Sequence, residues 1–458
     1  MREMEAAVAA NRFGLGAAPG EIRAIATDPR GALKAQLAGR PPLIREPLPA
    51  SDELLAAALK LRADAAGERQ GDAPPVAAAI QTIRELYAPA HAAEVLARFR
   101  EASSSQRSFA ERLVHFWSNH FAVSVDKVQV LGLAGAMERE AIRPHVLGNF
   151  AAMLLAVEQH PAMLLYLDNQ ASMGPNSQAA KLAGRRGRTL GLNENLGREI
   201  LELHTLGVEG GYTQEDVRAL ATLISGWSIG GGQGRLRGGE PGRFHFRPAF
   251  HEPGAQRLLG ARYGEEGLAQ GERAVRDLAR HPATARHLAV KLARHFVADD
   301  PPPALVATLA QVWLRTEGDL RSIYGALLDA DAAWKQPLAK FKTPADYIHS
   351  AWRALQLPVT QRDVRLFEQL GQRPFAPGSP AGWPDRSADW DGPAALMKRL
   401  EWAQDLGGQV GSRRNARLLA AESLGPLWSA SSDEAVARAQ DAAQALALWL
   451  GSPEFMRR

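Results

Sequence analysis

The stretch NENLGREILELHTLG, residues 193–207, shows the spacing that decides the fold. Its apolar residues recur every three or four positions, as they do along one face of an α-helix. Asn193 is a favoured N-cap, and Gly207 is a favoured residue just beyond a helix C-terminus. The stretch therefore predicts a helix over residues 193–206 with one buried face.

The same spacing runs through most of the 458 residues, so we expect a mainly α protein, one large multi-helix globular domain. Residues 243–250 depart from this pattern, because polar and aromatic side chains alternate there as they do in a strand. They predict a small β-hairpin insertion. Pro- and Gly-rich connections at residues 40–50, 66–75 and 373–393 mark where the domain would subdivide, if it does.

Composition excludes several kinds of site. The chain has no cysteine, which excludes disulfides, thiolate nucleophiles and cysteine-bound metals. Its net charge of +4 is not gathered into basic stripes, so we expect no nucleic-acid partner. We also expect no membrane span, because no apolar run approaches roughly 18 residues. Glu3 and Glu5 interrupt the place of a secretory signal, which predicts a cytoplasmic location.

Carboxylates of the 193–206 helix are the first candidates for chemistry. At about 100° per residue, Glu199 lies among the leucines of the apolar face. Asn195 and Glu202 flank it, and His204 falls at the far edge of that face. A carboxylate that faces a core must be paired, metal-bound or protonated, because burying an unpaired charge is costly. The alternative is structural: Arg198 and its acidic neighbours four residues away form ordinary surface ion pairs.

The segment ERLVHFWSNHF, residues 111–121, places two histidines on one predicted helix. His115 and His120 lie about 140° apart, so a regular helix cannot direct both at one metal ion. Two interpretations stay open. The histidines pack in the core with a backbone hydrogen bond, or one of them lines a cleft beside Asn119.

The predicted helix at residues 282–297 carries a cationic row. His287, Lys291 and His295 are spaced by four residues, and Arg294 lies beside them. Such a face is suited to an anion and would form the rim of a cleft, although a solvated surface has the same pattern.

Two stretches predict loops. Residues 168–192 show no clear helical pattern, and structureless loops of more than about 15 residues are usually functional or disordered. Because this loop leads into residue 193, we expect it to cover the start of that helix, with Asp168 and Asn169 close by. Residues 230–242, GGGQGRLRGGEPG, predict a flexible loop and lack the flanking elements of a nucleotide-binding loop.

Six segments distributed along nearly the whole chain carry a family resemblance. They are NRFGLG, HFWSNHFAVS, HPAMLLYLDNQASMGPNS, GLNENLGREILELHTLGVEGGYTQEDVRALATLISGW, HPATARHLAVKLARHFVADDPP and SPAGWPD. Together they resemble the bacterial domain-of-unknown-function 1800 (DUF1800) family. The resemblance implies no activity, cofactor or catalytic residue. It does imply a sulfatase-like companion protein as partner and an extracytoplasmic location, since many members resemble exported proteins.

These patterns leave two functions open. The first is a hydrolase or transferase with a polar Glu/His cleft, because shifted Glu and His groups suit acid–base chemistry at neutral pH. A divalent metal is left open as its cofactor. The second is a non-catalytic accessory or binding protein that helps a partner to assemble or mature. The predicted catalytic residues are Glu199, Glu202, His204 and His120. The predicted substrate-binding residues are Asn119, Asp168, Asn169, Asn195, Arg198, Trp227, His251, Lys291, Arg294 and His295.

Overall fold

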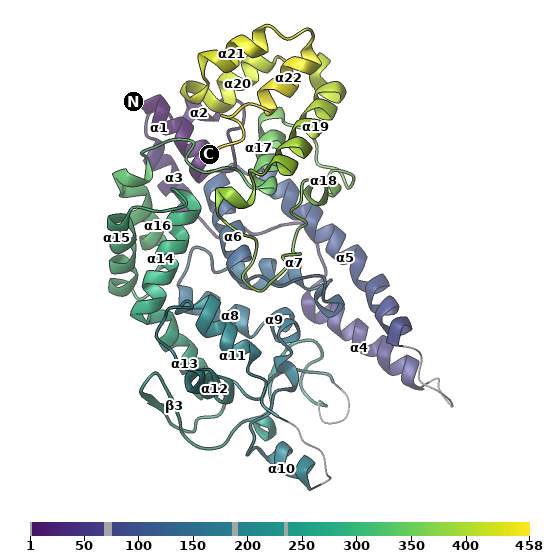
Figure 1. Ribbon diagram of the computed structural model, residues 1–458. Helices are drawn as coiled ribbons and strands as arrows, with labels where there is room; N and C mark the ends of the chain where they lie inside the picture. The colour runs from purple at the N-terminus through teal and green to yellow at the C-terminus, as the bar shows by residue number, and fades with distance from the viewer. Residues whose placement is uncertain (1, 68–75, 186–190, 233–236) are drawn as a thin grey trace.

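The computed structural model describes residues 2–67, 76–185, 191–232 and 237–458, and helices dominate it (Figure 1). In chain order the α-helices are α1 Arg2–Val8, α2 Glu21–Ile25, α3 Pro29–Ala38, α4 Ser51–Gly67, α5 Val76–Ser104, α6 Ser108–His120, α7 Ala134–Met137, α8 Phe150–Glu158, α9 Pro161–Tyr166, α10 Gln178–Gly184, α11 Asn195–Glu199, α12 Gln214–Leu223, α13 Leu268–Arg280, α14 Pro282–Phe296, α15 Pro303–Arg315, α16 Leu320–Asp329, α17 Pro344–Leu355, α18 Arg365–Gln369, α19 Pro393–Val410, α20 Ala416–Leu424, α21 Ala430–Ala437 and α22 Ala442–Leu450. Three short π-helices are η1 Ala9–Phe13, η3 Glu138–Ile142 and η5 Ile200–His204. The predicted mainly α fold is confirmed.

Two small antiparallel hairpins interrupt the helices. Strand β1 (Trp227–Ile229) pairs with β2 (Phe244–Phe246), and β3 (Gln256–Leu258) pairs with β4 (Ala261–Tyr263). The predicted strand is therefore present as β2, although it is shorter than residues 243–250, because the 3-10 turn Pro248–Phe250 follows it. Residues 233–236 of the predicted flexible loop lie outside the described residues.

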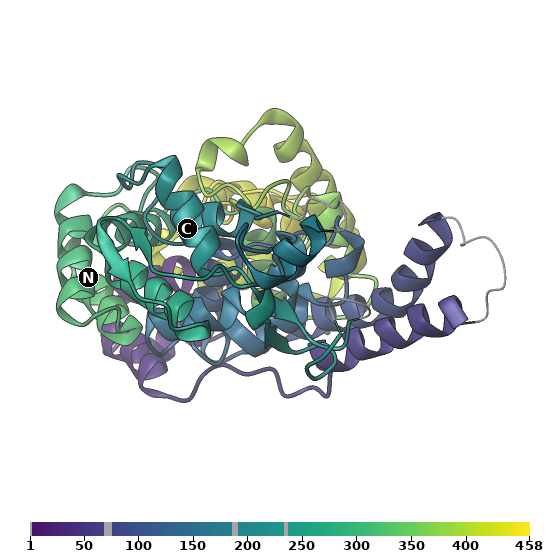
Figure 2. The same ribbon diagram turned by 90° about the horizontal axis from the view of Figure 1, so that it is seen from below.

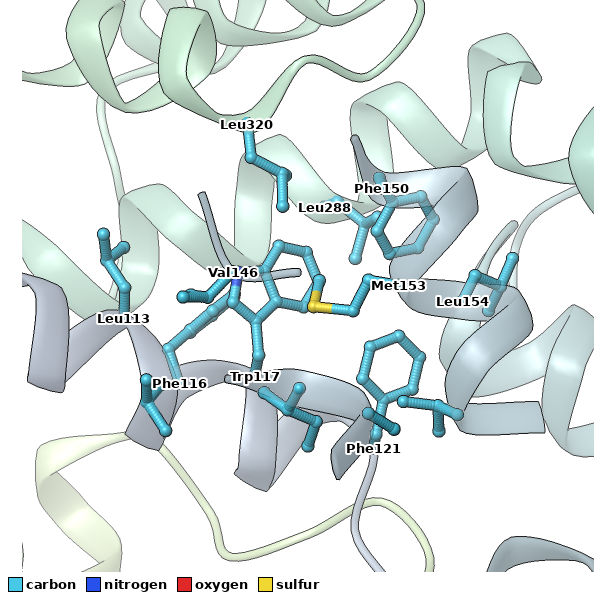
Figure 3. Packing of buried hydrophobic residues seen from close by; sticks show 14 of the residues in the cluster. Leu113, Phe116, Trp117, Phe121, Val146, Phe150, Met153, Leu154, Leu288 and Leu320 are labelled. Carbon is cyan, nitrogen blue, oxygen red and sulfur yellow. The ribbon is translucent and has the colours of Figure 1, made fainter. Parts of the chain in front are cut away.

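The larger hydrophobic cluster surrounds α6. Trp117 lies fully buried among Phe150, Met153 and other apolar side chains of α8, α14 and α16 (Figure 3). Its indole nitrogen donates a 2.6 Å hydrogen bond to the Tyr324 hydroxyl, which in turn donates to the Val146 carbonyl. The bulk of the indole is thus buried without leaving its N–H unpaired, as a buried tryptophan requires.

A second cluster fills the C-terminal end of the molecule, where α17 and α19–α22 gather (Figure 1). Trp352, Trp390, Trp402 and Trp449 are its largest aromatic members. Residues of α1 belong to both clusters, so the first helix joins them. The number of domains stays a prediction. None of the described helices combines the length and apolar character that a membrane crossing requires.

Helices α4 and α5 pack side by side as an arm that extends away from the body (Figures 1 and 2). Residues 68–75, which join them, lie outside the described residues and include most of the predicted connection at 66–75. The predicted loop at 168–192 contains a further helix, α10, which begins at an N-cap formed by Ser177. The loop prediction was wrong there, because a helix of seven residues has too few turns to show a clear apolar period.

A buried ion network holds α6 against the π-helix η3. The Arg143 guanidinium is fully buried and contacts the Glu111 carboxylate at 2.9 Å and the Glu138 carboxylate at 3.0 Å. Arg98 completes the network at 2.7 Å from Glu138. Two cations and two carboxylates therefore neutralise each other's charge in a place where little water is present to do so.

Replacing Arg143 by Met should strongly destabilise the fold, because it leaves two buried carboxylates with one cation. Removing one partner of a buried ion pair costs about 3–5 kcal/mol. The matched control is Arg276→Met, since the Arg276–Glu272 pair of α13 is partly exposed and exposed pairs contribute about 0–1 kcal/mol. Urea unfolding measures both free energies. If Arg143→Met lowers the free energy of unfolding no more than Arg276→Met does, the buried network does not stabilise the fold.

Candidate active site

The helix predicted at residues 193–206 divides into α11 and the π-helix η5. The Asn193 side chain accepts from the backbone N–H of Asn195 at 2.9 Å, and Gly207 has the predicted left-handed backbone, with φ 85°. A π-helix has a wider turn than an α-helix, so angular positions counted at 100° fail after Glu199. In the structure His204 is buried and Leu203 is only half-buried, the reverse of the predicted order.

His204 faces a carboxylate that the sequence does not reveal. Its Nδ1 lies 2.7 Å from Glu158 Oε1 of α8, and both side chains are almost completely buried. The His204 backbone carbonyl accepts a hydrogen bond from His120 Nε2 at 3.2 Å. The two imidazoles of the predicted site therefore lie side by side, with ring centroids 6.0 Å apart.

The other predicted groups of this helix lie apart from His120. Glu199 is half-buried, and burial raises the pKa of its carboxyl; no described residue donates a hydrogen bond to it. Glu202 accepts from the Tyr212 hydroxyl at 3.3 Å. Arg198 pairs with Glu194 at 3.4 Å, the ordinary surface pairing, and Asn195 is exposed.

A cavity of about 280 Å³ gathers five of the predicted residues where α6 meets α14. Its third wall comes from residues 381–389, within the connection predicted at 373–393. The lining residues are Phe116, Asn119, His120, Lys291, Arg294, His295, Ala381, Trp383, Pro384, Asp385, Arg386 and Asp389. A smaller cavity of about 90 Å³ shares Asn119, His295 and residues 383–385 with it.

Lys291 and His120 form the polar centre of this cavity. Lys291 Nζ lies 2.9 Å from His120 Nδ1. Burial, and then the nearby charge of Lys291, holds the pKa of His120 well below 6.5, so the ring is neutral. Lys291 donates to Nδ1, which fixes the other tautomer: Nε2 carries the proton and donates to the His204 carbonyl.

The amine of Lys291 is itself perturbed. Burial lowers its pKa from 10.5 to about 8; the neighbouring Arg294 adds to the shift, whereas Asp385 opposes it. Within the described residues, no carboxylate lies at ion-pair distance from this amine. Such a lysine is a candidate for chemistry, because its pKa is close to neutral pH.

Asp385 lies between His295 and Lys340 at the cavity wall. Its carboxylate is 3.3 Å from His295 Nδ1 and 3.8 Å from Lys340 Nζ. Burial alone would raise the pKa of the Asp385 carboxyl, but His295 and Lys340 outweigh it and bring the value down to about 2. The sequence interpretation missed Asp385, although the segment SPAGWPD that contains it was one of the six carrying the family resemblance.

The Asn119 amide fixes the third wall. It donates to the Trp383 carbonyl at 2.9 Å and accepts from the Trp383 N–H at 2.8 Å. Gly382 permits this approach: its φ is 83°, and a Cβ there would lie 2.2 Å from the Asn119 carbonyl oxygen. His287, the remaining member of the predicted cationic row, turns away and contacts the Leu203 carbonyl at 3.3 Å.

Besides Asn195 and Arg198, four further predicted binding residues lie away from the cavity. The Asp168 side chain is exposed and pairs with Lys127 at 2.8 Å. Asn169 is buried and donates to the carbonyl of Trp227, whose indole is also buried. His251 is held between the Ser225 carbonyl at 2.9 Å and the Gln270 amide oxygen at 2.8 Å. The predicted residues therefore do not all converge in one cleft.

In the part of the chain that the structure describes, no three His, Asp or Glu side chains are gathered as a metal site requires.

A family model described as a protein of unknown function, DUF1800, matches residues 8–457. No curated protein and no solved structure matches the chain.

The perturbed lysine predicts a pH-dependent stability. In the unfolded chain the pKa of Lys291 returns towards 10.5, so between about pH 8 and 10.5 the unfolded state binds more protons than the folded state. The penalty for burying the ammonium is thus complete below pH 8 and is relieved as the pH rises to 10.5. Lys291→Met has no such penalty. Its free energy of unfolding should therefore exceed that of the wild type at pH 7, and this difference should disappear by pH 10.5. Urea unfolding at pH 7 and at pH 10.5 measures these free energies. The control is Lys398→Met, which replaces an exposed lysine, so its free energy of unfolding should differ from that of the wild type by the same amount at both pH values.

Proposed function

Because this chain belongs to the DUF1800 family, proteins of unknown function, we propose its function from the geometry of the Lys291 cavity: a hydrolase or transferase in which Lys291 is the proton donor. One observation carries the proposal. An amine with no carboxylate partner among the described residues lies in a cavity wall, hydrogen-bonded to a neutral imidazole.

Lys291 has the charge state that a general acid needs. With a pKa of about 8, about nine-tenths of the amines carry a proton at pH 7, and each releases it far more readily than an ordinary lysine. General acids work best when their pKa is close to the working pH. The ammonium would donate its proton to a leaving oxygen or nitrogen as the bond to the transferred group breaks.

The neighbours of Lys291 suit this role. His120 accepts one of its N–H bonds and is itself fixed by the His204 carbonyl, which makes His120 a positioning residue. The Asp385 carboxylate stays ionised at neutral pH. It can accept a hydrogen bond from the attacking group, which is water in a hydrolase and a substrate hydroxyl or amine in a transferase. The proton that the attacking group loses would pass to bulk water, from which Lys291 would regain the proton that it gave to the leaving group.

A test of proton donation compares leaving groups of different basicity. Purified protein is assayed on matched pairs of esters, phosphoesters and amides, one member with an alkyl leaving group and one with a nitrophenyl or nitroanilide group. Lys291→Met should lose at least about 100-fold in rate on the alkyl member, and much less on the nitro-substituted member, whose leaving group departs without a proton. Circular dichroism confirms the fold, and Lys398→Met is the control.

Equal losses on both members would contradict proton donation. Unchanged rates in Lys291→Met, or no turnover of any substrate in the panel, would favour the alternative of a non-catalytic accessory or binding protein.

The pH profile provides a second prediction. Activity needs protonated Lys291, so it should fall as the pH rises through about 8. The negative charge of Asp385 stabilises the ammonium; Asp385→Asn should therefore move this alkaline limb to lower pH, visible in kcat/KM measured from pH 6 to 10. Asp389→Asn, which removes an exposed carboxylate lining the same cavity, is the control. An alkaline limb that stays in place in Asp385→Asn would show that another group sets it.

A further inference from the structure

The charges around the cavity are unequally matched. Three cations line it, Lys291, Arg294 and Arg386, against two carboxylates, Asp385 and Asp389. Two of these charges already have partners. Arg386 pairs with Asp300 at 3.2 Å on an exposed edge, and the Asp385 backbone and side chain are held by Lys340 and His295.

Lys291 and Arg294 form no ion pair with a described carboxylate. They are three residues apart on α14, so both side chains project to the same side of the helix. Among the described residues, neither has a carboxylate within ion-pair distance. Arg294 uses its Nε to donate to the Asp299 carbonyl at 3.1 Å, which orients the guanidinium and leaves its two terminal nitrogens free of any described partner.

We propose that these two cations bind the oxyanion group of a small substrate, a carboxylate, phosphate or sulfate. The inference rests on the proposed function, because it assigns a substrate class to the same cavity. A guanidinium with two free nitrogens presents the paired donors that planar and tetrahedral oxyanions accept. A partly buried pair of like charges also becomes more favourable once an anion neutralises it.

The size of the cavity limits the ligand. About 280 Å³ is near the lower end for small-molecule sites, which span roughly 300–1,000 Å³. The Phe116 and Trp383 side chains supply apolar surface for the remainder of the molecule. Because both cations would contact the oxyanion, the bond beside it would lie near Lys291, the proposed proton donor.

Calorimetric titration tests this binding without any turnover. The probes are inorganic phosphate, sulfate and acetate, each titrated into the full-length protein at pH 7. At least one should bind with millimolar or better affinity, and Arg294→Met should weaken it by at least 10-fold. Arg286→Met is the matched control: Arg286 is an exposed arginine of the same helix, outside this cavity, so the same charge is removed without the contact.

The three probes separate the sources of the oxyanion. Tighter binding of phosphate and sulfate assigns a tetrahedral group, and tighter binding of acetate assigns a carboxylate. The proposal is overturned if no probe binds, or if Arg294→Met and Arg286→Met bind equally well. The titration involves no bond breaking, so its result is independent of the leaving-group test. Anion binding without proton donation would contradict only the proposed function, and proton donation without anion binding would contradict only this inference.

Discussion

Burial of α6 on nearly every side is the constraint on which the rest of the structure depends. An apolar helix could be buried by packing alone. Helix α6 also carries charged and polar side chains, and burying such a side chain is costly unless it has a partner. Glu111 pairs with Arg143, and Arg112 lies 3.0 Å from Asp346. At the C-terminal end, Asn119 holds the Trp383 peptide and His120 accepts from Lys291. These pairings bring distant parts of the chain to one helix, and the last two also form walls of the cavity.

The cavity is thus a consequence of how the core satisfies its polar groups. His120 is almost fully buried and neutral, and its two nitrogens have one partner each. Behind it, the Glu158–His204 contact places another pair of ionisable side chains under the same helix. Burial lowers the pKa values of both His120 and Lys291, and such shifts are typical of sites that carry out chemistry. Of these groups, Lys291 lines the cavity and is hydrogen-bonded to His120, so a ligand in the cavity can reach its amine.

Sequence periodicity predicted which residues share one side of a helix or strand, because local backbone geometry determines this. The spacing along α14 placed Lys291, Arg294 and His295 on one side, and the structure has all three at one cavity. The alternation at residues 243–250 predicted β2 for the same reason. Periodicity failed at η5, where the extra residue in the turn moves His204 inwards, and it could not supply partners from elsewhere in the chain. Glu158 lies 46 positions before His204, and Asp385 lies 90 positions after His295; only the folded chain brings them together.

The hydrogen bonds between the Asn119 side chain and Trp383 make the cavity wall sensitive to chemical modification of one amide. One side-chain amide forms the pair of hydrogen bonds that a neighbouring β-strand would form with the Trp383 peptide. Hydrolysis of that amide to a carboxylate would keep the size of the side chain but replace its donor with a second acceptor, which would then oppose the Trp383 carbonyl oxygen. A single deamidation would therefore loosen the third wall at Trp383 without any change in the gene, and would leave the contacts of Asp385 with His295 and Lys340 in place.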